Sequence, residues 1–285
     1  MKKIQDLLMC PLCKCDLSEK LECTKCGNKY SYEHGVFNVV SPKLSSNQEI
    51  LWKITDDMIE NDIEATKQKD NDNASIKDYN AHKNKETLEA QKMQRKYMDS
   101  LIEGFSGTVC DLSTGMGSML QKMLNSNNKN FSIVCTDIDK HILMWTRKLK
   151  QTDNHRVFYV ATDGRYMSIK DKSFDYITSL AAFGNIPESD KVVKELYRIL
   201  KPNGKIIIQG NYIEKNSKSF ELAQSKGLER GLVEEYLIND LRNAGFENII
   251  STVVAKAVWA ENPYDLIPAA GDTQRYCIIQ AQRAK

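Results

Sequence analysis

The stretch that decides the fold of this 285-residue chain is TVCDLSTGMGSML, residues 108–120. Its first five residues have the apolar and β-branched character of a buried strand. From Ser118 onward, apolar side chains recur with a helical period. The small residues in between predict a tight turn at a helix N-terminus, where backbone N–H groups can face a ligand. Gly115 and Gly117 let that backbone approach the ligand closely.

The alternation of strand and helix continues outward from this stretch. Strands are expected at 108–112, 131–138, 157–163, 173–182 and 204–212, helices at 118–126, 140–150, 189–200 and 231–245, and two closing strands at 249–259 and 276–284. Strands that alternate with helices form crossover units and a mostly parallel sheet. The predicted fold class is therefore α/β, with a Rossmann-like, seven-stranded, mostly parallel sheet that ends in an antiparallel edge hairpin.

Composition excludes several classes of protein. Hydrophobic residues make up 41% and charged residues 27% of the chain, as in globular proteins. Forty basic and 38 acidic residues give a net charge of +2, so no strong field steers the chain to nucleic acid or to a membrane surface. No apolar run approaches the roughly 20 residues of a membrane helix, and the N-terminus is too polar for a signal peptide. The expectation is a cytoplasmic protein with no membrane partner.

Five of the eight cysteines lie between Cys10 and Cys26. The pairs Cys10–Cys13 and Cys23–Cys26 have the spacing of a tetrahedral four-thiolate site, for which zinc is favoured and an iron–sulfur cluster is the alternative. Cys15 either replaces Cys13 or is a bystander. Residues 1–40 are therefore predicted to form a small zinc ribbon, stabilised by its metal. The other three cysteines are expected to be buried, inert thiols.

Residues 41–100 are polar and are expected to form a helical linker or lid in front of a ligand-binding domain at 101–285. One amphipathic helix is predicted over 41–64, with Ser46 and Glu49 as a capping box. The polar tract 66–85 is interpreted as a flexible hinge or a mobile helix, and 86–105 is predicted to be helical again. A lid of this kind orders over its ligand.

Two further aspartates point to the kind of ligand. Asp137 ends the second strand, twenty residues after Gly117, where a ribose-binding acid belongs, and Asp163 ends the third strand at the same sheet edge. A dinucleotide fingerprint requires glycine where Leu120 stands, and no phosphate-binding Lys-Ser/Thr pair follows the turn. Carboxylates and a glycine turn without a phosphate site favour a nucleoside that carries positive charge, such as S-adenosylmethionine (SAM).

Four segments together resemble a known family. DLSTGMGSML, TDIDKHIL, ATDGRYMSIKDKSFDYITSL and KELYRILKPNGKIII are similar to the successive motifs of class I SAM-dependent methyltransferases, especially the UbiE-like branch. The resemblance covers roughly residues 80–285. Ser113 departs from the family's usual first glycine, which makes the backbone angle at that position a question for the structure.

The resemblance implies a role for each matching residue. Asp111, Ser113, Gly115 and Gly117 would line the methionine end of SAM. Asp137 would bind the ribose hydroxyls and Ile138 would pack on the adenine. Asp163 would accept a hydrogen bond from the adenine amine, beside the Gly164 backbone, and Leu180 or Ala181 would cover the other adenine face.

Catalytic residues are harder to identify. Transfer from a sulfonium requires mainly alignment and exclusion of water, with a general base for some acceptors. Asn185 and Tyr212, which follow the fourth and fifth strands, are the weak candidates for a catalytic role. Tyr79 and Tyr97 either close over the cofactor or serve in packing. The loop 259–268 is interpreted either as the wall of an acceptor pocket or as an edge cover.

The cysteine module leaves the acceptor open between two classes. It resembles the N-terminal zinc ribbons of some methyltransferases, including those that modify guanine in large-subunit ribosomal RNA, which implies an RNA-base methyltransferase with a docking ribbon. Residues 1–40 carry six lysines against five acids, however, and four thiolates on zinc bring the module near −1. A small-molecule acceptor is therefore preferred to RNA. A non-enzymatic SAM-binding module is a third reading.

Overall fold

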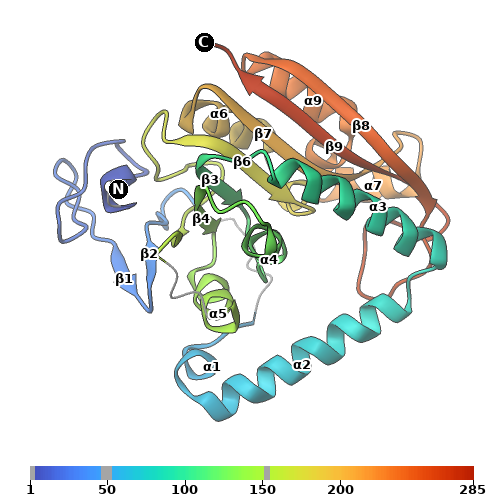
Figure 1. Ribbon diagram of the computed structural model, residues 1–285, viewed down its shortest axis with the longest axis horizontal. Coiled ribbons are helices and arrows are strands. Elements are labelled where there is room, and N and C mark those ends of the chain that lie inside the picture. The colour runs from blue at the N-terminus through green and yellow to red at the C-terminus, as the bar shows by residue number, and fades with distance from the viewer. Residues whose placement is uncertain (1–3, 46–52, 151–154) are drawn as a thin grey trace.

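The computed structural model describes residues 4–45, 53–150 and 155–285. Within them the chain forms one nine-stranded sheet in the order β1-β2-β5-β4-β3-β6-β7-β9-β8 (Figure 1). The strands are β1 (Ser31–Glu33), β2 (Val36–Asn38), β3 (Gly107–Leu112), β4 (Phe131–Asp137), β5 (Val157–Ala161), β6 (Phe174–Leu180), β7 (Leu200–Ile213), β8 (Phe246–Val258) and β9 (Thr273–Arg283).

The predicted α/β class is confirmed. Strands β5, β4, β3, β6 and β7 pair in parallel, and β9 lies antiparallel between β7 and β8. The sheet gains two strands over the predicted seven, because the hairpin β1–β2 of the cysteine module pairs with β5. Val36 lies opposite Tyr159 and Asn38 opposite Ala161. Three-residue strands of this kind carry too little periodicity to be predicted.

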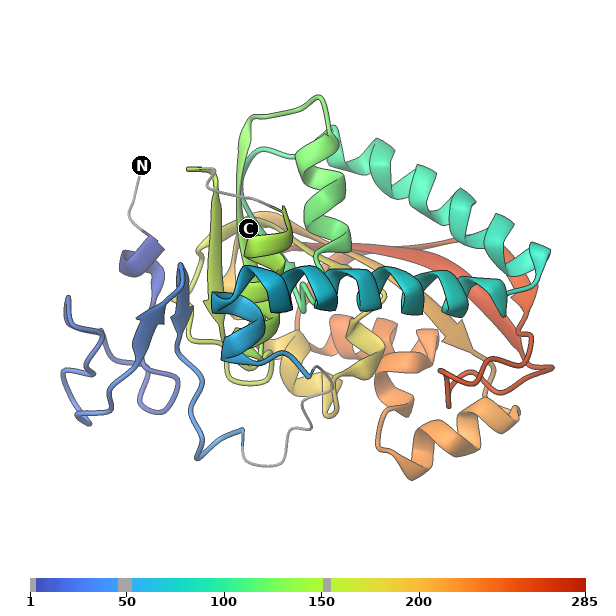
Figure 2. The same ribbon diagram turned by 90° about the horizontal axis from the view of Figure 1, so that it is seen from below.

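Helices cover both faces of the sheet. Helices α3 (Lys85–Ile102), α4 (Ser118–Asn125) and α5 (Lys140–Lys150) pack on one face, where their apolar side chains join one core cluster. Helices α6 (Ser189–Ile199) and α9 (Glu234–Asn243) share a second cluster with the opposite face. Figure 2 shows α3 and α4 on one side of the sheet and α7 (Lys218–Ser225), α8 (Glu229–Leu232) and α9 on the other. Among the described helices, none combines the length and apolar character needed to span a bilayer.

The segment before β3 differs from its prediction. The predicted capping box Ser46–Glu49 lies outside the described residues. Among the described residues of this segment, the first helix is α1 (Asp56–Glu60), where the Thr55 hydroxyl accepts from the Met58 N–H at 3.4 Å. Asn61 then ends α1 and caps α2 (Asp62–Ala81), so the predicted single helix is broken there.

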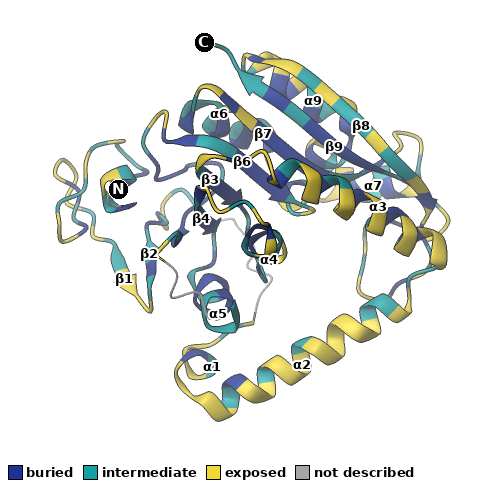
Figure 3. Cartoon of the chain, viewed as in Figure 1, coloured by how far each residue is buried: buried dark blue, intermediate teal, exposed yellow. Residues whose placement is uncertain are grey.

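The polar tract 66–85 is mostly one long, exposed helix, α2 (Figure 3). It lacks an apolar face, yet it has fixed partners on α5. The Trp145 indole N–H donates to Asp72 at 3.0 Å, and Lys148 pairs with Asp62 at 2.9 Å. Polar contacts of this kind hold α2 beside the sheet without burying it.

Helix α3 is fixed to the sheet by one buried amide. Gln94 is 1% exposed, and its Nε2 donates to the carbonyls of Gly210 on β7 and Cys277 on β9 at 2.8 and 2.9 Å. Gly210 and Cys277 lie opposite each other in the β7–β9 ladder. One side chain therefore ties the antiparallel edge to the segment that leads into β3.

We predict that Gln94→Ala lowers the free energy of unfolding by about 2–4 kcal/mol, because two buried carbonyls lose their donor. Urea denaturation measures the loss. Gln121→Ala is the matched control, since its amide donates to Asn125 in an exposed position on α4, and its effect should stay within about 0.5 kcal/mol. A loss below about 1 kcal/mol for Gln94→Ala would contradict the bridging role.

Candidate functional site

A cavity of about 500 Å³ opens at the carboxyl ends of β3, β4, β5 and β6. All predicted cofactor-binding residues except Gly117 line it: Asp111, Ser113, Gly115, Asp137, Ile138, Asp163, Gly164 and Leu180. Its wall also includes Tyr79 from α2, Asn185 from the short helix η2 (Phe183–Asn185), and the apolar side chain of Ile186. This size suits a small organic ligand. The topology therefore brings residues from four strands and α2 to one site.

The turn between β3 and α4 has a left-handed backbone at three alternate residues. The φ angles are +53° at Ser113, +50° at Gly115 and +76° at Gly117. Ser113 therefore keeps the conformation that a glycine adopts easily, although it carries a side chain. Gly117 precedes α4, and a Cβ on it would lie 2.7 Å from the Thr146 methyl group. Gly117 thus permits close packing on α5 and does not line the cavity.

Two aspartates give the cavity its negative character. Asp137 accepts from the Gly115 N–H at 3.0 Å through Oδ2 and from the Asp139 N–H at 3.2 Å through Oδ1. Asp111 is 1% exposed, and its Oδ2 has no hydrogen-bond partner in the described chain. Burial, together with the nearby Asp137 charge, raises the pKa of Asp111 to about 7. Burial also raises the pKa of Asp137.

The third aspartate has a counter-charge. Arg165, itself buried, donates from Nε to Asp163 Oδ1 at 3.1 Å and from Nη2 to Oδ2 at 2.8 Å, and its backbone N–H donates to Oδ1 at 2.9 Å. A second contact joins Arg165 Nη1 to Glu188 at 3.1 Å. Arg165 was missed from the sequence, because an arginine two residues after an acid gives no signal of a bidentate pair. It fixes the orientation of the Asp163 carboxylate.

The two candidates for a catalytic role, Asn185 and Tyr212, lie in different parts of the structure. Asn185 lines the cavity, whereas Tyr212 does not. Tyr212 is 2% exposed on the face of β7 that packs on α6 and α9, with its hydroxyl close over Gly210. It lines a second cavity of about 360 Å³ on that side. Neighbouring residues of a strand point to opposite faces of the sheet, and the side chain of Tyr212 therefore lies on the face away from the first cavity.

Tyr79 and Tyr97, the two tyrosines of the 41–100 segment, also lie in different parts of the structure. Tyr79 lines the cavity, and its backbone carbonyl accepts from Asn262 in the loop 259–268 at 3.3 Å. Tyr97 packs partly buried against the core beneath α3. Only Tyr79 is therefore placed where a residue could cover a ligand.

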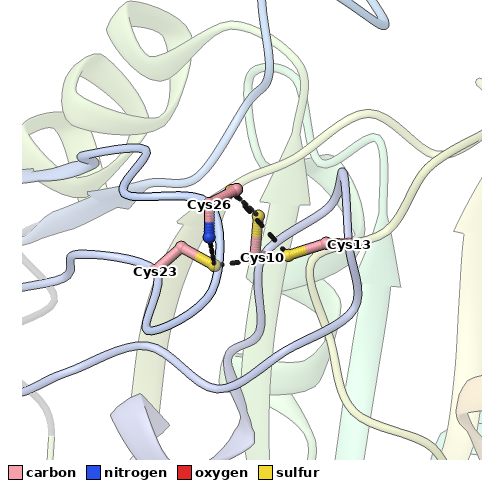
Figure 4. Close-up of side chains that lie close together, drawn as sticks. All are labelled: Cys10, Cys13, Cys23 and Cys26. Atoms are coloured by element: carbon pink, nitrogen blue, oxygen red, sulfur yellow. Dashed lines mark hydrogen bonds between the residues drawn. The ribbon is translucent and has the colours of Figure 1, made fainter.

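Four cysteines converge in the N-terminal module (Figure 4). The sulfurs of Cys10, Cys13, Cys23 and Cys26 all lie within 4.8 Å of one another, and individual pairs stand 3.3, 3.7 and 3.8 Å apart. A zinc ion with Zn–S bonds of about 2.3 Å in a tetrahedron requires sulfurs about 3.8 Å apart. The geometry therefore fits a four-thiolate metal site. Cys15 is outside the cluster, and its thiol donates to the Cys13 carbonyl at 3.4 Å.

Donors around the cluster favour thiolates. The Lys25 and Cys26 N–H groups donate to Cys23 Sγ at 3.5 Å, and the Asn28 amide donates to Cys26 Sγ at 3.1 Å. Burial opposes ionisation of Cys23, but these N–H groups lower its pKa to about 6. Thiolate is the form that binds metal. Both the hydrogen-bond donors and the spacing of the four sulfurs therefore suit a bound metal ion.

Comparison with known proteins identifies the class. Residues 110–208 match the family described as a methyltransferase domain. These residues contain the second half of β3, β4 to β6 and most of β7, together with every residue that lines the cavity except Tyr79. Residues 110–208 are therefore similar to a methyltransferase domain, in agreement with the motif resemblance.

Individual proteins are more distant. The chain is 28% identical over 111 residues to the ubiquinone/menaquinone biosynthesis C-methyltransferase UbiE of Rickettsia prowazekii, a match that covers 37% of this chain and 45% of that protein. The chain thus spans about half the length of the curated relatives it matches. It also resembles in fold the phosphoethanolamine N-methyltransferase 2 of Haemonchus contortus in complex with SAM (TM-score 0.51, 18% identity, 66% of this chain and 53% of that chain). The YcgJ protein of Bacillus subtilis is similar too (TM-score 0.53, 14% identity, 67% and 98%).

We predict that Ser113→Gly raises the free energy of unfolding by about 0.5–1 kcal/mol. Relief of the left-handed strain contributes about 1–2 kcal/mol, and the extra freedom of glycine in the unfolded chain removes about 0.4–1 kcal/mol of that gain. Urea denaturation checks the sign. Ser179→Gly on β6, where the backbone is extended, should instead destabilise the protein. A destabilised Ser113→Gly variant would contradict the strain argument.

Proposed function

We propose that the chain transfers the methyl group of SAM to a small-molecule acceptor. One observation carries the proposal: four aspartates and no basic residue line a cavity at the carboxyl ends of parallel strands. Such a cavity suits a ligand with positive charge, and its described lining offers no basic side chain to a phosphate. SAM supplies a sulfonium and an ammonium group, and the sulfonium activates its methyl group for displacement.

Each end of the cavity has a distinct part in this proposal. Asp111, whose Oδ2 has no partner among the described residues, would face the cationic groups at the methionine end. Asp137 keeps free lone pairs beyond its two backbone partners and would accept from the ribose hydroxyls. Asp163, held by Arg165, would accept from the adenine amine. Ile138 and Leu180 line the wall between these acids and would pack on the adenine.

The chain's own contribution to methyl transfer is alignment and exclusion of water. Asn185 lines the cavity after β6, where its amide can orient an acceptor by hydrogen bonding. Tyr79 covers the cavity from α2, and its ring meets that of Tyr264 edge-on at 6.1 Å. Burial raises the pKa of Asp265, a loop carboxylate that contacts the Tyr79 hydroxyl. These groups form the acceptor side of the proposed site.

The acceptor class follows from size and charge. The cavity has a volume of about 500 Å³, and its lining includes Tyr79 from α2; this size favours a compact acceptor. Two lysines of the cysteine module already have acidic partners: Lys14 pairs with Glu195 at 3.1 Å and Lys29 with Glu22 at 3.9 Å. An RNA footprint requires a basic stripe of free side chains. The contacts therefore support a small molecule over RNA.

Methyl-labelled SAM tests the proposal directly. We expect the purified chain to move label into the small-molecule fraction of a cell extract, and not into its RNA. Asp137→Ala should weaken SAM binding at least about tenfold, because a charge-assisted hydrogen bond is worth roughly 1.5–3 kcal/mol. Asp99→Ala, on the exposed side of α3, is the control. Label in RNA, with binding that weakens steeply as salt rises, would overturn the choice of acceptor.

We also predict that SAM affinity rises about tenfold between pH 5.5 and pH 7. With the pKa of Asp111 near 7 in the free protein, most of this carboxyl is protonated at pH 5.5 and about half is ionised at pH 7. A cationic ligand favours the ionised form, so binding must release a proton at the lower pH. Calorimetry in buffers of different ionisation enthalpy measures that release. Asp111→Asn should abolish most of the pH dependence and Asp99→Asn should leave it unchanged; a flat profile for the unmodified protein would contradict the assignment.

A further inference from the structure

The loop that carries Asp163 is held by the cysteine module. This adenine loop, residues 162–173, runs from the end of β5 to the start of β6. The Met9 N–H donates to the Ser168 carbonyl at 2.9 Å, and the Lys170 N–H donates to the Leu7 carbonyl at 2.8 Å. Leu8 and Ile169 lie opposite each other between these two bonds. The stretch just before Cys10 therefore pairs with the loop like a short antiparallel strand.

Side chains continue this contact into the core. The Ser168 hydroxyl donates to the Val39 carbonyl at 2.5 Å, and its N–H donates to the Thr162 hydroxyl at 2.9 Å. Leu8 and Val39 of the module are fully buried in the same cluster as Met167 and Ile169 of the loop. The module thus contacts residues 167–170 of the adenine loop directly, and Ser168 carries the contact on to Thr162, which precedes Asp163.

Two ion pairs join the same surfaces. Lys14 lies inside the Cys10–Cys15 turn, and its ammonium donates to the Met167 carbonyl at 3.3 Å and to Glu195 of α6 at 3.1 Å. Asp16 pairs with Lys170 at 2.5 Å. The first cysteine turn, which supplies half of the metal ligands, is therefore the part of the module that faces the loop.

The shape of that turn depends on the metal. A module of about 40 residues has too small a core to fold firmly by itself, and four-thiolate sites fold with their ion. Within the turn, the Cys10 N–H donates to the Cys15 carbonyl and the Lys14 N–H donates to the Cys10 carbonyl, both at 2.9 Å. Loss of the ion would release Cys10 and Cys13, and with them the residues on either side that hold the loop.

We infer that the cysteine module positions the adenine loop, so that metal occupancy of the four-cysteine cluster sets the affinity of the cavity for SAM. The inference rests on the proposed function, since it takes Asp163 to be the adenine acceptor. Coupling of this kind is reciprocal: SAM raises the metal affinity by the same factor by which the metal raises SAM affinity.

Calorimetry with S-adenosylhomocysteine, which binds without turnover, tests the coupling. The zinc-loaded chain should bind it at least about fivefold more tightly than the chain stripped with a chelator, and added zinc should restore the affinity. Hydrogen exchange within 162–173 should accelerate in the stripped chain, ahead of exchange in β3 and β6. Equilibrium zinc competition with a chelator of known affinity should give the same factor when S-adenosylhomocysteine saturates the protein.

A variant with intact cysteines separates positioning from loss of folding. Lys14→Met removes the contacts with Met167 and Glu195 and should weaken S-adenosylhomocysteine binding about threefold while zinc content stays at one ion per chain. Lys29→Met is the matched control, because Lys29 contacts only Glu22 among the ion pairs of the described chain, and it should leave the affinity unchanged.

A ligand that lacks the adenine amine distinguishes a specific effect on the Asp163 contact from a general loss of stability. S-inosylhomocysteine has a carbonyl in place of that amine, so its affinity should depend much less on zinc and on Lys14. Equal effects on both ligands, or affinities within twofold for loaded, stripped and Lys14→Met protein, would overturn the inference and leave the proposed function standing. Failure of the zinc-loaded protein to bind S-adenosylhomocysteine at all would overturn both.

Discussion

The arrangement of the cavity depends on how the Gly115 peptide is held. Its N–H donates to Asp137 at the end of β4, and its carbonyl accepts from the Thr146 hydroxyl on α5 at 2.6 Å. One residue earlier, the Thr114 N–H donates to the Thr136 carbonyl at 2.8 Å. The turn after β3 is therefore braced by the neighbouring strand and helix before any ligand arrives. Preorganisation of this kind is what permits a serine at position 113 to stay in the left-handed region.

The cavity's charges are distributed according to the proposed ligand. The acids at the methionine and ribose positions, Asp111 and Asp137, have no basic partner, and burial raises the pKa of each. Asp163 at the adenine position is instead paired with Arg165. A cation can compensate an unpaired carboxylate, whereas a neutral adenine cannot, so a buried acid at that end needs a counter-charge of its own. The contrast between the unpaired Asp111 and the paired Asp163 thus agrees with a ligand that is cationic at the proposed methionine end and neutral at the proposed adenine end.

The sequence predicted those parts of the molecule that repeat or converge locally. Strand–helix alternation predicted the parallel sheet, and the acids after β4 and β5 were expected at the same edge because parallel strands end together there. Contacts between segments far apart in the sequence could not be predicted from it. Nothing in the sequence indicates that Val36 pairs with Tyr159, or that Arg165 folds back on Asp163. Tyr212 was misplaced because the strand period assigns faces only once the register is known.

Helices without an apolar face were also difficult to predict from the sequence pattern. Residues 66–85 lack an apolar face, and their helix depends on the cap at Asn61 and on single contacts such as Trp145 with Asp72. A composition that suggests a hinge is then compatible with a well-formed helix, because the hydrogen bonds that hold it come from a neighbour far along the chain. Local propensity is a weak guide wherever tertiary partners decide.

The cysteine module lies where it covers the unpaired backbone groups at one edge of the parallel sheet. Without it, β5 would end the parallel sheet with a free row of backbone groups, which proteins avoid. Strand β2 covers that row, and β1 then forms a new edge of only three residues, where Glu33 pairs with Lys140 at 2.9 Å. A short, charged edge is a poor template for further pairing. The module therefore has a structural reason to be attached at this point, independent of any nucleic acid, and its contacts with β5 place it next to the loop that follows that strand.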